Sequence, residues 1–202
     1  MIRKRHKIDH YCAVMEQIKK RVEVVNGFLH GGCYTLYMAT TLECMYLQVR
    51  KILELIVLGS LVVNKKEFST HHKNFHKLWN GGEILKKIEK NNPDFYPKPV
   101  KEKPSSKPRV KSHLEDIQDG YLTKDEFIEV YGRCGKIAHA DNPFGSKTNY
   151  PYYEKQISEW LRKIMTLLNT HTIRLVNDQN MYLIHMKEQG DDKVHGYTFA
   201  RV

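Results

Sequence analysis

The sequence lacks an apolar segment long enough to cross a membrane. Its longest apolar run, Ile52–Val63, has twelve residues and contains Glu54, whereas a membrane-spanning helix needs about 20 apolar residues. The first residues, MIRKRHKIDHYC, begin with charge but are followed by no apolar segment of the kind that signal peptides contain. We therefore expect no membrane-spanning segment and no signal peptide, and we expect a cytoplasmic protein.

Cysteine pairs of the kind that bind metals or form redox couples are also lacking. The four cysteines, Cys12, Cys33, Cys44 and Cys134, are scattered and form no C-x-x-C pair, so reduced thiols are the simplest expectation. The sequence also has no glycine-rich phosphate loop, no nucleophile elbow and no paired-carboxylate motif. We therefore expect no cofactor.

Positive charge is abundant but confined to two segments. The formal net charge is +10, of which residues 1–7 contribute +4 and residues 98–111 contribute +5, leaving +1 for the rest. Such segments attract phosphates, although they can also serve solubility alone. The candidate RNA-binding residues are the basic side chains of the second segment: Lys98, Lys101, Lys103, Lys107, Arg109 and Lys111.

Apolar spacing predicts four long helices, at about 8–29, 36–63, 123–139 and 152–177. The first and fourth place apolar residues at alternating intervals of three and four, which is typical of one buried helix face. The second is apolar nearly all round in its second half, which indicates a helix contacted on several sides. The third begins with Thr123 and Glu126, the arrangement of a capping box. His171 falls on the apolar face of the fourth, where a buried, hydrogen-bonded histidine is expected.

Two further segments interrupt or follow these helices. Residues 66–120 contain two short helical stretches and then five prolines between residues 93 and 108, which exclude regular helix there and indicate an inserted flap. Residues 181–200 alternate with a period of two on either side of QGDD, which predicts a terminal β-hairpin. The expected fold is a single mainly α domain over residues 1–202: a four-long-helix bundle with a short-helix and Pro-rich flap and a C-terminal β-hairpin.

Two patterns that resemble metal sites are better explained without a metal. Residues 115–126 resemble a calcium-binding loop, but the first two ligand positions hold Glu115 and Ile117, where such loops need Asp and a second oxygen ligand. His72 and His76 lie four residues apart, as zinc ligands on a helix do. No carboxylate completes that set, and neighbouring lysines would repel the ion. We therefore expect no metal site.

The segment RCGKIAH places Arg133 and His139, with five residues between them, at the end of the third predicted helix. In this motif, and in the order of its helices, the chain resembles the HEPN family, the higher-eukaryote and prokaryote nucleotide-binding domains. These are helical bundles whose ribonuclease members carry an R-x(4–6)-H motif. The resemblance covers about residues 8–63 and 123–177. It implies a metal-independent endoribonuclease of a bacterial defence or stress system, which cleaves single-stranded RNA as a homodimer that brings two motifs together.

The chemistry of these two side chains suits that reaction. Attack of an RNA 2′-OH on the adjacent phosphate needs a proton acceptor, and histidine is suited to that role. A guanidinium can hold two phosphoryl oxygens at once. The resemblance thus makes His139 the general base or acid and Arg133 the phosphate-binding residue, with RNA and a neutralising protein as partners. Cys134 departs from the family pattern, in which a polar residue often follows the arginine.

The second hypothesis is a non-catalytic HEPN-like module that binds a protein partner or nucleic acid. Six residues of helix rotate through about 600°, which leaves Arg133 and His139 about 120° apart. They converge only if the helix bends or ends near Gly135. A shared cleft for the two side chains favours the enzyme. Two side chains that point apart favour the module. In that case we expect His139 to interact with the C-terminal carbonyls of the helix and Arg133 to be solvated.

Overall fold

A computed structural model of the chain describes a set of residues that covers most of the sequence: 2–62, 66, 68–70, 73, 81–106, 112–140, 142–145 and 147–199, with side chains from residue 7 onwards. Two groups of residues named above lie outside this set. The first is the histidine pair whose spacing resembles that of zinc ligands, His72 and His76. The second comprises three of the candidate RNA-binding residues, namely Lys107, Arg109 and Lys111.

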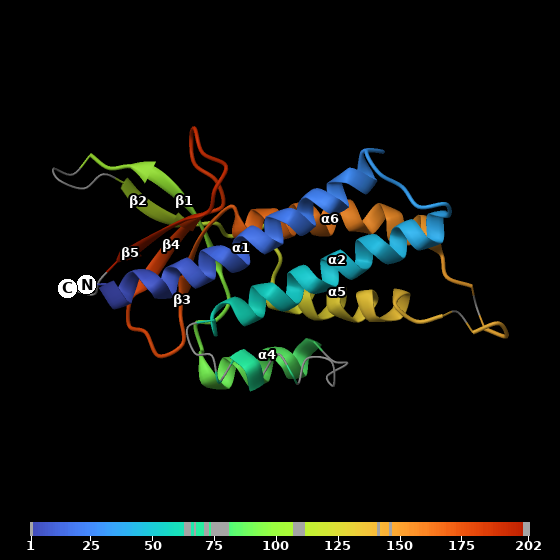
Figure 1. The fold of residues 1–202 in the computed structure, drawn as a ribbon, viewed down its shortest axis with the longest axis horizontal. Helices are drawn as coiled ribbons and strands as arrows, with labels where there is room; N and C mark the ends of the chain where they lie inside the picture. Colours follow the sequence, from blue (N-terminus) through green and yellow to red (C-terminus); the bar gives the residue numbers. More distant parts are fainter. Residues whose placement is uncertain are drawn as a thin grey trace.

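The long helices of the described residues lie side by side: α1 (Ile2–Leu29), α2 (Met38–Gly59), α5 (Lys124–Ile137) and α6 (Tyr150–Leu168) (Figure 1). A shorter helix, α4 (Gly81–Asn91), packs against α5 and α2. Because α2 contacts α1, α4, α5 and α6, it has the central position that its apolar sequence predicted. None of the helices in the described part of the chain is long and apolar enough to cross a membrane.

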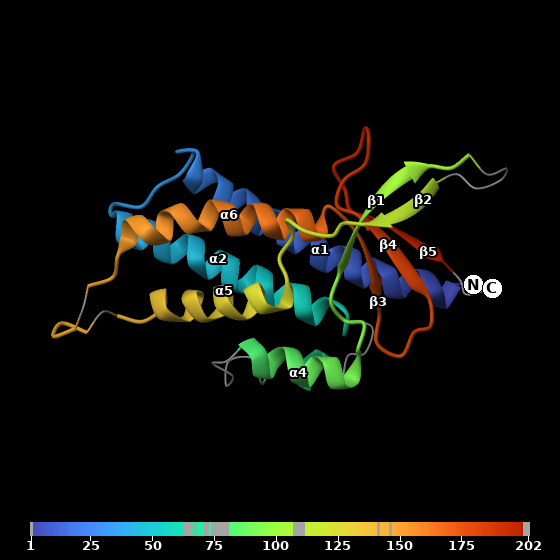
Figure 2. The same ribbon diagram turned by 180° about the vertical axis from the view of Figure 1, so that it is seen from behind.

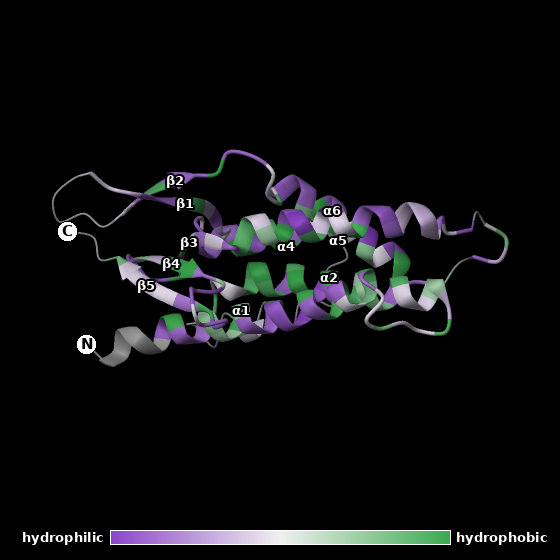
Figure 3. Ribbon diagram, turned by 90° about the horizontal axis from the view of Figure 1, so that it is seen from above, coloured by the Kyte–Doolittle hydropathy of each residue, from purple (hydrophilic) through white to green (hydrophobic). Residues whose placement is uncertain are grey.

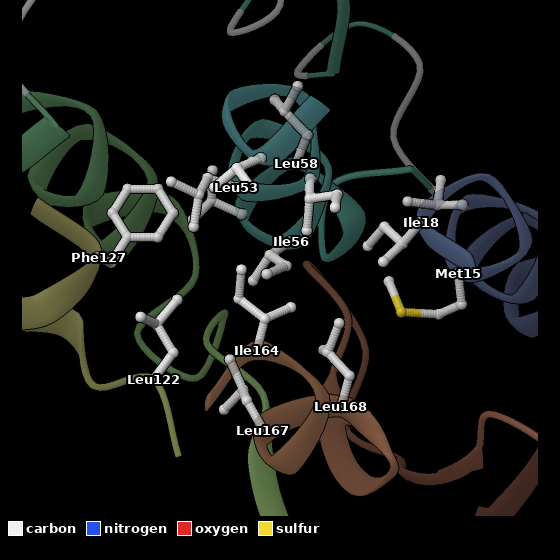
Figure 4. Packing of buried hydrophobic residues seen from close by; sticks show 14 of the residues in the cluster. Met15, Ile18, Leu53, Ile56, Leu58, Leu122, Phe127, Ile164, Leu167 and Leu168 are labelled. Carbon is white, nitrogen blue, oxygen red and sulfur yellow. The ribbon is translucent and has the colours of Figure 1, made fainter. Parts of the chain in front are cut away.

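These helices enclose an apolar core. Figure 4 shows Met15 and Ile18 of α1, Leu53 and Ile56 of α2, and Leu168 of α6 gathered in one cluster, and each of them is buried. Burying one such side chain contributes about 1.5–3 kcal/mol relative to leaving it in water. Hydrophilic residues are prominent on the outer turns of α1 and α6 (Figure 3). Each of these two helices therefore has one buried stripe, as the spacing predicted.

The helices α1 and α2 approach closely at Gly59. A Cβ atom at this position would lie 2.9 Å from Cε2 of Tyr11, so any larger residue would force the two helices or the ring to shift. Tyr11 is fully buried, and its hydroxyl is hydrogen-bonded to Nε2 of His171 at 2.9 Å. Tyr11 thus connects α1 with both α2 and the strand that carries His171.

A five-stranded antiparallel sheet closes one end of the bundle (Figure 2). Its strands are, in spatial order, β2 (Ser112–Asp116), β1 (Lys98–Pro104), β3 (Thr170–Arg174), β4 (Met181–His185) and β5 (His195–Phe199). The predicted terminal hairpin is present as β4 and β5, which pair antiparallel. It is one part of a larger sheet, and β5 contacts α1.

This sheet makes the fold mixed α/β, and the prediction of a mainly α four-long-helix bundle is wrong. Part of the error lies in the predicted flap at 66–120, which contains β1 and β2. Its prolines exclude helix, but a strand tolerates proline where the N–H that it lacks would not face a neighbouring strand. Since β1 pairs with β3 only at Lys98 and Pro99, one side of β1 beyond Pro99 is an edge, where proline is tolerated.

The other part of the error is the end of the fourth helix, predicted at residue 177. Helix α6 ends at Leu168, and β3 begins at Thr170. Thr170, Thr172 and Ile173 are β-branched residues, which favour strand over helix. His171 therefore lies on a buried strand rather than on a helix face. The prediction that it is buried and hydrogen-bonded is confirmed.

Candidate functional site

Arg133 lies on the side of α5 that faces α6. The helix begins with the predicted capping box, in which the Thr123 hydroxyl and the Glu126 carboxylate each accept a hydrogen bond from the backbone N–H of the other residue. Arg133 donates from Nε and Nη2 to Oε1 of Glu129, at 3.0 and 2.7 Å. Its Nη1 donates to the hydroxyl of Tyr152 at 2.5 Å. All three guanidinium nitrogens are therefore engaged, although the Arg133 side chain stays partly exposed.

His139 lies beyond the end of α5, in a different environment. The helix continues through Gly135 and ends at Ile137, so it neither bends nor ends where convergence with Arg133 would require. His139 is exposed. It lines a cleft of about 550 Å³ between α2 and the end of α5, which we call the His139 cleft. The structure thus does not bring Arg133 and His139 of one chain together: Arg133 contacts α6, and His139 faces α2.

The arginine that lines the His139 cleft is Arg50 of α2. Its Nη2 donates to the hydroxyl of Tyr131 at 2.9 Å, and its Nε donates to Oε1 of Glu54 at 3.3 Å. The guanidinium carbon lies 4.4 Å from the centroid of the Tyr131 ring. A Cβ at Gly135 would lie 3.5 Å from Nη1 of Arg50. Nη1 therefore lies beside Gly135, the glycine of the RCGKIAH segment. Nη1 has no hydrogen-bond partner among the described residues, which leaves it available to an anion.

Two side chains in or beside the cleft, Cys134 and Tyr131, are disfavoured for proton transfer or nucleophilic attack. Cys134 lines the cleft but is almost fully buried, and this burial raises the pKa of its thiol to about 12. Burial likewise raises the pKa of the Tyr131 hydroxyl to about 12. Both groups therefore keep their protons near neutral pH, and neither can act as a nucleophile or base there. Imidazole is the side chain best suited to proton transfer in this range, which directs attention to His139.

The described part of the predicted basic segment is largely neutralised by its neighbouring strand. Lys98 and Lys103 of β1 form ion pairs with acidic residues of β2, each at 2.6 Å: Lys98 with Asp116, and Lys103 with Glu115. Lys101 is exposed and lines a separate cavity beside α6. Whether any of these residues binds RNA stays a prediction.

No metal-binding cluster occurs among the described residues, in which no group of three or more His, Cys, Asp or Glu side chains could hold an ion. The acidic segment that resembles a calcium loop has other contacts. Glu115 lies in β2, and Glu126 caps α5 and also contacts Lys163. All four cysteines are free thiols, as predicted.

Sequence reasoning missed Arg50, which comes from a different helix than the motif. One signal was present in the sequence. Arg50 and Glu54 are charged residues four apart within the largely apolar second half of α2, where an ion pair on one helix face is expected. Such a pair inside an apolar stretch indicates a polar contact with a neighbouring helix, here Tyr131 of α5.

Comparison with known proteins adds no relative. No family model, no curated protein and no solved structure matches the chain. The resemblance to the HEPN family therefore stays a prediction that rests on the motif and the order of the helices.

Proposed function

We propose that this chain is a HEPN-like, metal-independent endoribonuclease that cleaves single-stranded RNA. The observation that supports this proposal most is that His139 and Arg50 line one cleft, with Nη1 of Arg50 unbonded among the described residues. An imidazole and a guanidinium are the two groups that cleavage by an internal 2′-OH needs.

The reaction assigns one task to each group. His139 accepts the proton of the 2′-OH while the oxygen attacks the adjacent phosphorus. The bond from phosphorus to the 5′-oxygen breaks, and this oxygen takes a proton from a second imidazolium or from water. Arg50 holds the non-bridging phosphoryl oxygens, where negative charge increases during the attack. The products are a 2′,3′-cyclic phosphate and a 5′-OH.

Arg133 has a supporting role in this proposal. To bind a phosphate it would have to give up its two bonds to Glu129 and its bond to Tyr152. It also lies 5.6 Å above the ring of Trp160, measured from the guanidinium carbon to the ring centroid. We therefore expect Arg133 to hold α5 against α6 and so to position His139, which follows the end of α5.

We also propose that a second copy of the chain binds at the end of the bundle opposite the sheet. The connections α1–α2 and α5–α6 both lie at the end opposite the sheet (Figure 1). They carry strongly exposed apolar side chains: Tyr34, Leu36, Tyr37 and Met38 in the first and Phe144 in the second, with exposures from 56% to 96%. Exposed apolar residues in this number are typical of a contact surface. A symmetric homodimer through this end would place two His139 side chains near one interface.

A cleavage assay with matched variants tests these assignments. Wild type, His139→Ala, Arg50→Lys and Arg133→Gln are incubated with end-labelled single-stranded RNA in EDTA. We expect His139→Ala to slow cleavage about 100- to 10,000-fold. Arg50→Lys, which keeps the charge but removes Nη1, is expected to slow it about 100-fold. Arg133→Gln should have a much smaller effect, and His10→Ala, which removes an exposed histidine of α1, should have none.

The pattern of rates separates the alternatives. Wild-type activity in His139→Ala would contradict the enzyme proposal. A larger loss in Arg133→Gln than in Arg50→Lys would return the phosphate-binding role to the motif arginine. A folded wild type that leaves RNA intact but binds RNA or a protein would favour the non-catalytic module.

A further inference from the structure

Two adjoining cavities lie along the outer side of α6. The first, of about 490 Å³, lies between β1 and the C-terminal half of α6. The second, of about 350 Å³, lies between α6 and the end of α1. Arg162 and Met165 line both cavities. We call the two together the α6 groove. It shares none of the described residues that line the His139 cleft.

The α6 groove has two cations without an acidic partner. Arg162 is exposed, and its Nη1 reaches the carbonyl oxygen of Gly120 at 3.5 Å. Lys101 is exposed and lines the first cavity. No carboxylate of the described residues forms an ion pair with either. This distinguishes Lys101 from Lys98 and Lys103 of the same strand, which are both paired with acidic residues of β2.

The one acidic residue of the first cavity is already engaged. Oε2 of Glu102 accepts a hydrogen bond from the Ser112 hydroxyl at 3.0 Å, and its Oε1 lies 2.5 Å from Nε2 of His185. The floor of this cavity is apolar, formed by Val100, Ile117 and Met165. The cavity therefore combines an apolar floor with positive charge at its rim.

We propose that the α6 groove binds two successive nucleotides of a single-stranded RNA, with the phosphate between them on Arg162 and one base in each cavity. Each cavity has the size of a small-ligand site. Arg162 lies at the boundary between the two cavities, and in RNA a phosphate likewise lies between two successive nucleosides. Single-stranded nucleic acids bind in positively charged grooves whose cations contact the phosphates, and in this groove the apolar side chains would pack against the bases. Lys101 contacts the phosphate on the far side of the first cavity. The choice of RNA as the ligand rests on the proposed function.

Fluorescence anisotropy with a short labelled single-stranded RNA tests this proposal. The His139→Ala protein serves as background, so that the RNA stays intact, and affinity is measured at several salt concentrations. Arg162→Gln and Lys101→Gln should each weaken binding about tenfold. Each should also reduce the slope of log affinity against log salt by about 1. Lys87→Gln removes the same charge from an exposed position of α4 that lines neither cavity, and should change affinity by about twofold or less.

RNA affinity and RNA cleavage are measured separately, so failure of the α6 groove proposal can be distinguished from failure of the endoribonuclease proposal. No binding of the RNA, or equal affinity of Arg162→Gln and Lys87→Gln, would overturn the proposed α6 groove, whether or not the protein cleaves RNA. Weakened binding in Arg162→Gln together with an RNA that wild type leaves intact would retain the groove and reject the endoribonuclease.

Discussion

Tyr11→Phe should destabilise the protein by removing a single hydrogen bond. The Tyr11 hydroxyl and the His171 ring are both fully buried, and the oxygen lies 2.9 Å from Nε2. Nδ1 of His171 lies 2.6 Å from the carbonyl oxygen of Leu168, so Nδ1 carries the proton of the neutral ring and Nε2 accepts the proton of Tyr11. Phenylalanine keeps the ring against Gly59 but leaves Nε2 buried without a donor.

The magnitude follows from that unsatisfied acceptor. Leaving one buried polar group without a partner costs about 1–3 kcal/mol. For a chain of this length, each kcal/mol lowers the Tm by roughly 2–4 °C, so we expect a decrease of roughly 2–12 °C. Thermal unfolding followed by circular dichroism measures it. Tyr34→Phe, at a tyrosine that is 83% exposed, is the control and should leave the Tm unchanged. An equal Tm for Tyr11→Phe and wild type would refute this reasoning.

The buried pair of Tyr11 and His171 also predicts that the stability of the protein depends on pH. Burial lowers the pKa of His171 to about 4, below the ordinary value of about 6.5 that it regains on unfolding. Between these values the unfolded chain binds the additional proton, so this group's contribution to stability is lost as pH falls. The loss is about 1.4 kcal/mol per pH unit in that window. The stability difference between wild type and His171→Gln, measured by denaturant unfolding at several pH values, should therefore shrink towards pH 4. A constant difference would contradict the assignment.

Three further predictions concern packing, capping and assembly. Gly196→Ala should lower stability by about 1–3 kcal/mol, because a Cβ there would lie 2.5 Å from Cγ1 of Ile8. Gly132→Ala, at an open helix position, should instead raise it by about 0.5–1 kcal/mol; thermal unfolding compares the two. Thr123→Ala should cost about 0.5–2 kcal/mol through the lost capping box, which urea unfolding measures. Leu36→Glu should shift a homodimer towards monomer in light scattering, and an unchanged mass would argue against the proposed interface.

Local signals predicted the helices well because each signal lies within the element it describes. Helix α1 ends at Leu29, just before HGG, and Gly31 takes a positive φ of 71°. The capping box at Thr123 is present at the start of α5. The near-continuous apolar sequence of α2 predicted its central position.

The sheet could not be predicted in the same way because its pairing is between distant segments. Pro99 of β1 is paired with His171 of β3, and no local pattern links the two. Residues 170–176 fit both a helical spacing and an alternation, and the β-branched residues decide in favour of strand. The proline segment was assigned correctly as non-helical, but composition alone does not distinguish a flap from a strand.

Of the two motif residues, only His139 is among the residues that line the cleft, and its role stays a prediction. The motif drew attention to His139, which lines a cleft, but sequence spacing cannot reveal which cation shares that cleft. Arg133 lies on α5 and donates hydrogen bonds to Glu129 and Tyr152. Arg50 lies on a different helix, α2. The helix rotation between Arg133 and His139 already indicated two different faces.

We propose that His139 acts as the base in RNA cleavage without a metal. The end groups of RNA incubated with wild type and with His139→Ala in EDTA test this role directly. We expect fragments with 2′,3′-cyclic phosphate and 5′-OH ends from wild type, and intact RNA from the variant. Intact RNA from a folded wild type, or the same fragments from both proteins, would contradict it.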